Sequence, residues 1–398
     1  MQTQQLLKKN NLRPLEIHKS ECAESRKEDA LEKYKAIPMP KEKEEDWRYT
    51  EIEKLKLENF EPFETKVKIE ISDLTSDLKE KGVIFTSINS ALEDYPAALN
   101  YFFRNTKIEK DKFVALNAAF FGAGIFLYVP KNVEISEPLR AVFHAEGQNS
   151  IIHNLIVLEQ NSKIDFIEEY SNQENDAEQL NVGITEVFAN NNSKINFYHL
   201  NNWTKNVDSI MNIIGTAERN AAVNWISGCF GGKLNRLKID TLFNGEGSSC
   251  SNIGIFLGKG KEHIDFTTNV FHNVQHTTNN ILVDGILRDE STSVYRGLIK
   301  IEKEAQKTFS YLENHILKLG DKTLANSIPS LKIDANDVKA SHGATVGQVN
   351  EELLFYLMSR GLSRDEAQDL VVEGFFEPVI EKIPLEELRE RIRGMVRG

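Results

Sequence analysis

Cysteine is scarce in this chain of 398 residues, which holds only Cys22, Cys229 and Cys250. No two of them form a C-x-x-C pair, and their spacing matches no structural zinc site. An odd and sparse set of cysteines indicates a reducing compartment rather than a disulfide framework. We therefore expect a cytoplasmic protein.

An excess of positive charge and long apolar runs are also missing. The chain carries 48 Lys and Arg against 60 Asp and Glu, a formal net charge of −12. Such a surface repels the phosphate backbone of nucleic acids. Residues 1–12 contain no apolar stretch that would act as a secretory signal. Residues 113–130 are uncharged but contain Asn117, glycines and a proline, so we expect buried strands there and no membrane span.

The common catalytic motifs are absent. The sequence has no G-x-S-x-G and no H-E-x-x-H, and residues 258–261 (GKGK) do not form a P-loop. His272 and His276 lie four apart on an expected strand, about 13 Å at ~3.3 Å per residue, too far to share one metal ion. We expect these histidines, and His263, to be hydrogen-bonded or surface residues. The pattern indicates neither a common hydrolase nor an ATPase.

The middle of the chain carries a repeat. Residues 135–333 are rich in Val, Ile, Phe, Thr and Asn and have almost no helical periodicity. The run NSKIDF at residues 161–166 recurs as NSKINF at residues 192–197 and more loosely as NAAVNW at residues 220–225. The three copies begin 31 and 28 residues apart. Repeats of about 30 residues built from short strands are typical of a solenoid, whereas β-propeller blades take ~40–50 residues. We therefore predict a mainly β protein with a β-helix core.

The N-terminal part is expected to be mainly helical. Residues 24–35 have helix-forming composition. Trp47 and Tyr49 follow in a charged run, and we expect them to anchor this segment to the body of the protein. We place an N-terminal helical domain at residues 1–108 and the β-helix core at residues 109–346.

The C-terminal residues 347–398 are expected to form a second helical domain. Asn350 can cap a first helix, and Ser363 begins a capping box for a second. Pro378 should end or kink this second helix, and Pro384 suits the first turn of a third. These helices could cap the β-helix or dock a partner, and the pattern leaves both interpretations open.

The most distinctive segment is residues 336–347 (NDVKASHGATVG), at the junction of the β region and the helical tail. Its His342 stands between small residues, with Ser341 before it and Gly343 and Ala344 after it. Another chain or a ligand can therefore approach the imidazole closely. The structural alternative is a buried turn histidine whose ring nitrogens are both hydrogen-bonded.

These motifs resemble a known family. Residues 341–347 (SHGATVG), with residues 355–361 (FYLMSRG) and the Gly-Phe pair at 374–375, resemble the C-terminal signature of the SufD family. This family belongs to the SUF iron–sulfur cluster assembly machinery. Residues 45–50 (EDWRYT) resemble its N-terminal element, and the resemblance runs from about residue 38 to residue 380. The paralogous SufB family is the nearest rival, but it has Glu-His-Glu-Ala-Thr where this chain has SHGAT.

The resemblance implies an architecture and a function. It implies a right-handed parallel β-helix between two helical domains, in a non-enzymatic scaffold that pairs with a SufB-like paralogue through the β-helices. His342 resembles the residue proposed to act at that interface, in transient iron binding or in a nascent iron–sulfur cluster shared with the partner. No stably bound cofactor is expected. A SufC-like ABC ATPase would dock on the C-terminal helices, at Phe355, Tyr356, Arg360, Gly361, Gly374 and Phe375.

Two positions depart from the family pattern. Ala340 stands where relatives often have Cys, and Lys332 reverses a charge in the P-x-L-E-I element, here residues 329–333. Three scattered cysteines also suggest that the partner supplies the thiolates. Other classes stay open: a β-helix enzyme acting on polysaccharide, and a structural solenoid that self-associates. The sequence also leaves open a homodimer of the isolated chain, and whether it holds iron, sulfide or a flavin.

Overall fold

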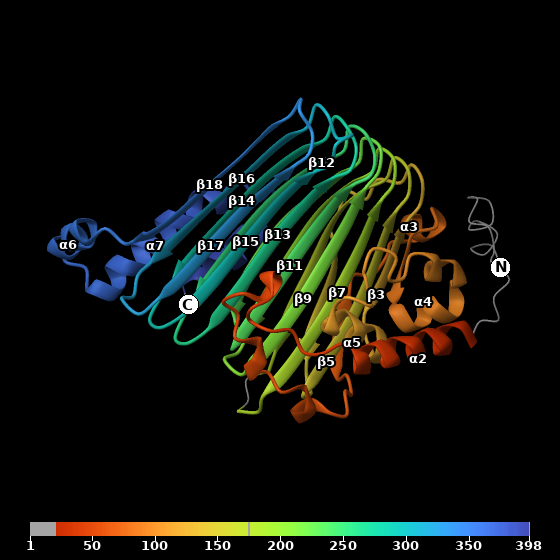
Figure 1. The fold of residues 1–398 in the computed structure, drawn as a ribbon, viewed down its shortest axis with the longest axis horizontal. Coiled ribbons are helices and arrows are strands. Elements are labelled where there is room, and N and C mark those ends of the chain that lie inside the picture. Colours follow the sequence, from red (N-terminus) through yellow and green to blue (C-terminus); the bar gives the residue numbers. More distant parts are fainter. Residues whose placement is uncertain (1–20, 174–175, 398) are drawn as a thin grey trace.

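The computed structural model describes residues 21–173 and 176–397. Its centre is a solenoid of two nine-stranded sheets, with helices at both ends of the chain (Figure 1). Consecutive strands of the solenoid alternate between the two sheets, and neighbours within each sheet run parallel from β3 and β4 onward. The mainly β solenoid fold predicted from the repeat is therefore confirmed.

From β3 onward, the even-numbered strands form one sheet and the odd-numbered strands form the other, with β1 at the edge of the first and β2 at the edge of the second. Sheet I contains β1 (Val67–Ile71), β4 (Leu139–Ala145), β6 (Lys163–Asn172), β8 (Lys194–Trp203), β10 (Ala222–Gly231), β12 (Ser249–Gly258), β14 (Thr278–Leu287), β16 (Phe309–Lys318) and β18 (Lys339–Gln348). Sheet II contains β17 (Leu324–Ile333), β15 (Thr292–Ile301), β13 (His263–His272), β11 (Leu234–Phe243), β9 (Val207–Ala217), β7 (Gln179–Ala189), β5 (Asn149–Leu158), β3 (Ile125–Val129) and β2 (Ile84–Ser87).

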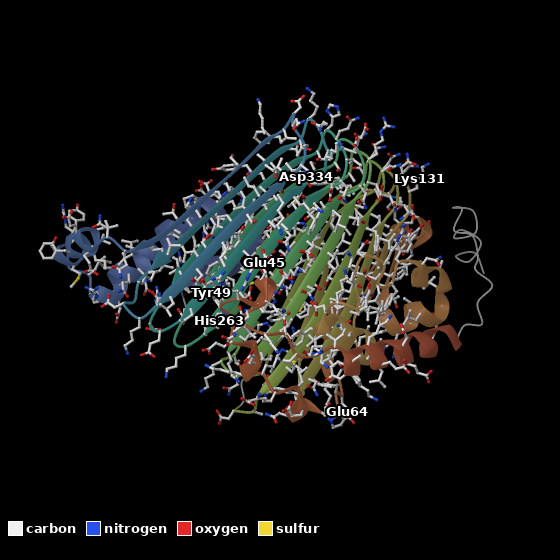
Figure 2. The ribbon with its side chains drawn as sticks, viewed as in Figure 1. Glu45, Tyr49, Glu64, Lys131, His263 and Asp334 are labelled. Atoms are coloured by element: carbon white, nitrogen blue, oxygen red, sulfur yellow. The ribbon has the colours of Figure 1, made fainter. Side chains whose placement is uncertain are left out.

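The repeated asparagines explain the regular stacking. Asn132, Asn161, Asn192 and Asn220 all have positive φ angles, between 55° and 62°, a conformation that asparagine tolerates better than most residues. Their side-chain amides form a ladder in which Asn161 donates to Asn132 at 2.7 Å and Asn192 donates to Asn161 at 3.0 Å. The coils that carry these four asparagines therefore turn at the same place. Figure 2 shows Lys131, next to this ladder, and Asp334, which follows β17, along one edge of the solenoid.

The interior is filled by side chains that stack from coil to coil. Phe166, Phe197 and Trp225 occupy the same register in β6, β8 and β10. Their rings lie 5.6 Å and 5.3 Å apart between centroids, and all three are fully buried. Aromatic pairs at such distances stabilise a core beyond their buried area.

The N-terminal part covers the outer face of sheet II. It contains α2 (Glu21–Ala36), η1 (Glu45–Trp47), η2 (Ile52–Lys54), η3 (Leu57–Phe60), α3 (Ser76–Glu80), α4 (Ile88–Asp94), η4 (Pro96–Asn100) and α5 (Lys112–Phe120). Strands β1 and β2 come from this same part and pair antiparallel with β4 and β3. The segment assigned to a helical domain thus also closes the first coil, and the boundaries at residues 108 and 346 stay predictions.

One expectation for this part is wrong. Residues 113–130 were expected to form buried strands, but α5 occupies the first part and only β3 is a strand. The Asp111 side chain caps α5 by accepting hydrogen bonds from Phe113 N at 2.8 Å and Val114 N at 3.0 Å. An N-cap carboxylate followed by an alanine- and leucine-containing run favours a helix.

Trp47 anchors the N-terminal segment as expected, and Tyr49 does not. The indole of Trp47 is buried, with the Arg236 guanidinium 3.9 Å from its ring centroid. Tyr49 is exposed and has a positive φ of 67°. Asp265, buried on sheet II, accepts a hydrogen bond from Thr50 Oγ1 at 2.7 Å and pairs with Arg236 and Arg296. The segment is therefore held by a buried cluster of charges.

The C-terminal part forms three helices, α6 (Glu351–Ser359), α7 (Arg364–Ile380) and α8 (Glu386–Arg397). Of these, α7 and α8 cover the outer face of sheet I, and α6 packs on α7 beyond the end of the sheets (Figure 1). Asn350 caps α6 and Ser363 forms the predicted capping box of α7. Pro378 does not end α7, because the helix continues to Ile380. No helix in the described part of the chain is long and apolar enough to span a membrane.

Candidate functional site

The last coil of the solenoid, β17 and β18, is open on one side. Each of its strands is the final strand of its sheet. In the inner coils the inward-facing side chains are covered by the next coil, but here two inward-facing apolar residues lie exposed: Val346 is 43% exposed and Ile333 39%. An uncovered strand edge with exposed apolar side chains is a natural place for another chain to add.

His342 lies in this last coil. It belongs to β18 and pairs in register with Leu312 of β16, a fully buried residue that faces the solenoid interior. The imidazole of His342 is exposed, and no hydrogen bond to it occurs among the described residues. The alternative of a buried turn histidine is therefore wrong, because the strand continues through residue 342 and no further coil covers it.

The small residues around His342 leave room beside it. Ala340 and Ala344, two positions before and after His342 on β18, present only methyl groups on the same face as the imidazole. Gly343 faces the opposite, outer side, where an added Cβ atom would meet only the Tyr311 hydroxyl, at 3.9 Å. Ala340 faces the same side as His342 and packs against the end of the solenoid core. A thiol at position 340 would lie on the same inward face as the imidazole, whereas Lys332 is exposed on β17.

A second polar cluster near β18 was missed in the sequence. His315 Nδ1 lies 2.8 Å from Asp284 Oδ1, and His315 Nε2 lies 3.2 Å from Glu313 Oε1. Burial raises the pKa of Asp284 above its ordinary value, against the opposing effect of the hydrogen-bonded His315. Glu313 and His315 are two residues apart on β16, so their side chains lie on the same face of the strand. This spacing of an acidic residue and a histidine was the signal in the sequence that could have revealed the cluster.

The other histidines singled out in the sequence have structural partners. His272 is buried, with Nδ1 2.7 Å from Thr277 Oγ1 and Nε2 3.2 Å from Ser310 Oγ. His263 Nδ1 lies 2.7 Å from Thr292 Oγ1. His276 is exposed in a turn after the end of β13, so it does not share a strand with His272 as we expected. Hydrogen-bonded or surface roles are confirmed.

The two cysteines whose side chains the structure describes, Cys229 and Cys250, are buried rather than reactive. Burial raises the pKa of the Cys229 thiol far above its ordinary value, and raises that of Cys250 to about 12. Both therefore remain thiols and not nucleophilic thiolates at neutral pH. The side chain of Cys22 lies outside the described residues.

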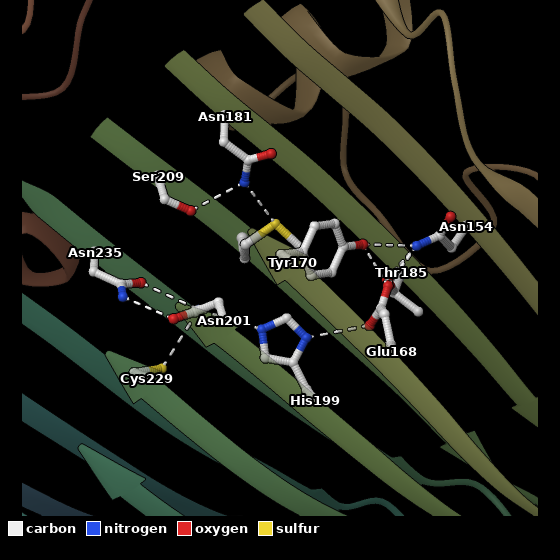
Figure 3. Close-up of polar contacts among 11 residues, drawn as sticks. Asn154, Glu168, Tyr170, Asn181, Thr185, His199, Asn201, Ser209, Cys229 and Asn235 are labelled. Carbon is white, nitrogen blue, oxygen red and sulfur yellow. Dashed lines mark hydrogen bonds and ion pairs between the residues drawn. The ribbon is translucent and has the colours of Figure 1, made fainter. Parts of the chain in front are cut away.

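Cys229 ends a polar network inside the solenoid (Figure 3). Buried Glu168 accepts a hydrogen bond from Thr185 Oγ1 at 2.8 Å and lies 3.2 Å from His199 Nδ1. Asn201 continues the network, with its Nδ2 3.7 Å from Cys229 Sγ. Because these buried polar groups have partners, we assign the network a structural role in holding the coils in register.

The residues expected at the ATPase surface fall into two groups. On α6, Phe355 is 73% exposed and Tyr356 52% exposed, and Arg360 donates a hydrogen bond to the Tyr356 hydroxyl at 3.1 Å. Gly361 ends this helix with a φ of 101°. The second group lies on α7: Gly374 is exposed, whereas Phe375 is partly buried and packs on Phe376. The α6 surface is the larger exposed apolar patch, and Leu353 and Met358 extend it.

The described residues offer no complete metal site. Within residues 21–173 and 176–397, no group of three or more His, Cys, Asp or Glu is arranged to hold a metal ion. A metal at His342 would therefore need further ligands from another chain.

Known families match most of this chain. The family described as "SUF system FeS cluster assembly, SufBD core domain" matches residues 141–375, and "SufBD protein N-terminal region" matches residues 72–141. The chain is 31% identical to the iron–sulfur cluster assembly protein SufD of Bacillus subtilis, an alignment that covers 92% of this chain and 91% of the relative. It is 29% identical to SufBD family proteins of Staphylococcus saprophyticus and Staphylococcus aureus, over 79% of this chain and 68% of each relative.

Proposed function

Because this chain belongs to the SufBD family of SUF iron–sulfur cluster assembly proteins, we propose that it is a non-catalytic scaffold subunit of that machinery. In this proposal it works in the cytoplasm, pairs with a SufB-like paralogue through the last coil of its solenoid, and binds a SufC-like ABC ATPase on α6. The observation that carries the proposal is the open last coil, which brings His342 and exposed apolar side chains together on a strand edge.

The last coil suits pairing with a second solenoid. Its inward-facing residues, such as Val346 and Ile333, are exposed only because no further coil follows. A partner whose own last coil has the same construction would bury these residues and extend the sheets. Burying apolar surface contributes roughly 25 cal/mol per Å², and strand pairing adds main-chain hydrogen bonds.

His342 would then supply one ligand at a shared site. Imidazole is a common iron ligand and can replace thiolate in iron–sulfur ligation. Since the described cysteines are buried and no metal cluster is complete in the described residues, the remaining ligands would come from the partner. This fits transient iron or a nascent cluster held between two subunits, and no resident cofactor.

The α6 surface suits a second partner. Phe355 and Tyr356 point away from the helical domain, since both are more than half exposed. Exposed aromatic residues beside an arginine are typical of binding hot spots. The surface is separate from the last coil, so both partners could bind at once.

The test is co-purification with point variants. The tagged chain would be expressed with the SufB-like and SufC-like proteins of its own genome. Val346→Asp should lose the SufB-like chain and keep the ATPase, and Phe355→Asp should do the reverse. Ile71→Asp is the matched control, because Ile71 is a 37% exposed apolar residue on β1, at the opposite edge of sheet I. Recovery of homo-oligomers alone would contradict the proposal.

The role of His342 needs a separate readout. His342→Ala should leave the complex assembled but abolish iron–sulfur cluster formation in the reconstituted complex, measured by the visible absorbance of the cluster. An unchanged cluster yield would contradict the assignment of His342 as a ligand, but it would not contradict the proposed pairing with the SufB-like chain.

A further inference from the structure

A cavity of about 410 Å³ lies in the N-terminal part, away from the last coil and from α6. Its walls come from α2, α4, α5 and the segment between η4 and α5, which pack near β3, β5 and β7 (Figure 1). The volume lies within the ~300–1,000 Å³ of small-molecule pockets. The apolar lining consists of Leu92, Phe102, Phe103, Ile108, Ala118 and Phe121.

The aromatic wall of this cavity is held rigidly from behind. Buried Glu186 of β7 accepts hydrogen bonds from Phe103 N at 2.7 Å and Asn105 N at 3.1 Å. Buried His153 of β5 lies 3.2 Å from Glu186 through Nε2, and its ring stacks on Phe102 at 4.4 Å between centroids. Two buried side chains of sheet II thus fix the backbone that presents the two phenylalanines.

Phe103 itself adopts a conformation that needs this support. Its φ is 52°, in the left-handed region that bulky side chains rarely occupy. Strained residues persist where the surroundings over-determine them, and they cluster at ligand sites. The wall is therefore built before any ligand arrives, which lowers the ordering cost of binding.

The charge at the cavity is positive and available. Lys27 and Arg104 both line it, with Lys27 Nζ 4.8 Å from the Phe121 ring centroid. The one acidic residue in the lining, Asp29, already pairs with Lys33 at 2.6 Å. Within the described residues, neither Lys27 nor Arg104 has a salt-bridge partner. An arginine fork matches a carboxylate.

We propose that this cavity binds an amphipathic carboxylate, whose aliphatic or aromatic body fills the apolar walls while its carboxylate meets Arg104 and Lys27. The medium-chain fatty acids are the simplest ligands of this chemistry. The site is independent of partner binding at the last coil and at α6, so it goes beyond the scaffold function.

The test is direct binding to the full-length chain by titration calorimetry with decanoate. Decanol and decyltrimethylammonium are matched probes that keep the chain and remove or reverse the charge. We expect saturable binding of one decanoate per chain and at least tenfold weaker binding of both other probes. Equal affinity for decanol, or no saturable binding of decanoate below its micelle concentration, would overturn the proposal.

Two variants place the ligand. The double variant K27Q/R104Q should weaken decanoate binding at least tenfold, whereas K35Q, a change of an exposed lysine on the same helix outside the cavity, should leave it unchanged. Ala118→Leu should weaken binding by filling the cavity, with circular dichroism as the check on folding. Unaltered affinity in folded K27Q/R104Q and Ala118→Leu would overturn the location.

A free fatty acid and an acidic membrane lipid are both amphipathic anions, although the lipid carries a phosphodiester in place of the carboxylate. Flotation with phosphatidylglycerol vesicles separates the two sources. Absence of flotation beside decanoate binding supports a free acid, and flotation that decanoate competes away supports a lipid in the same cavity. Flotation that decanoate does not affect would contradict the proposal.

Discussion

Every coil of the solenoid consists of two strands, one in each sheet, but the last coil has a neighbouring coil on one side only, whereas each inner coil has one on both sides. Ile301 of β15 and Ile333 of β17 occupy the same register. Ile301 is fully buried and Ile333 is 39% exposed. On the outer face of sheet II, the inner coils are also tied to the N-terminal segment through Asp265. This difference in burial predicts that the last coil contributes less to the stability of the isolated chain than an inner coil does, and it leaves that coil's inward face available to a partner.

The largest expected effect comes from the charge cluster that covers the inner coils. Burial alone would raise the pKa of Asp265, but Arg236 and Arg296 outweigh it and hold the pKa below its ordinary value. Asp265→Ala leaves two mostly buried guanidinium groups without their partner, which should cost about 3–5 kcal/mol of unfolding free energy. Urea denaturation measures this. Glu290→Ala, which removes an exposed pair with Lys322, is the control and should show no measurable change.

The same-register isoleucines test the comparison most directly. Ile301→Ala should lower the unfolding free energy of the isolated chain by about 2–4 kcal/mol because it leaves a cavity in the core. Ile333→Ala should cost about 1 kcal/mol or less, since its side chain is already partly in water. Equal costs in urea denaturation would mean that the last coil is as well packed as the inner ones.

For binding of the partner, we expect Ile333→Ala to have the larger effect of the two substitutions. Ile333→Ala should then weaken pairing with the SufB-like chain, and Ile301→Ala should not affect it in any variant preparation that remains folded. Pull-down of the SufB-like chain by each variant measures this.

The next effect depends on pH. Burial lowers the pKa of His272 from its ordinary value to about 3, so the native state holds the neutral imidazole. The unfolded chain gains a proton near the ordinary pKa of about 6.5. Stability should therefore be complete above about pH 6.5 and fall by about 1.4 kcal/mol per pH unit as the pH drops towards about 3. His272→Gln should flatten this slope in urea denaturation, and exposed His342→Gln should leave it unchanged.

A comparably small effect concerns the helices beyond the last coil. The Ser363 hydroxyl accepts a hydrogen bond from Glu366 N at 3.3 Å, as part of the capping box of α7. Ser363→Ala removes this bond and should lower the unfolding free energy by about 1 kcal/mol. Hydrogen exchange of the first α7 amides is the measurement. Ser359→Ala in α6 is the matched control; equal exchange in the two variants would contradict the role of the cap.

Much of this fold could be predicted from periodicity. The NSKI repeat marked the solenoid because each asparagine begins a coil in the same left-handed turn, and the helix caps at Asn350 and Ser363 follow from local chemistry. Residues 113–130 were mistaken for strands because an uncharged apolar run fits a buried strand or a buried helix equally well. The cap at Asp111 is the local signal that separates the two.

The site could be predicted only in part. The motif marked His342, but not that β18 is the last strand and leaves the imidazole uncovered, because sheet order depends on contacts between distant segments. The cluster of Asp284, Glu313 and His315 was missed for the same reason, since Asp284 comes from a neighbouring coil. The cavity near Phe103 depends on Glu186, more than 80 residues away in sequence.

The regular repeat of the coils also fixes the length of the solenoid. In a nine-stranded sheet, neighbouring strands are ~4.8 Å apart, so the eight spacings place the two edges of each sheet roughly 38 Å from one another. Because every coil repeats the same turn, inserting or deleting one coil of about 30 residues would change that span by one strand spacing and leave both ends intact. The number of coils thus sets how far the cavity near α5 lies from anything bound at β18.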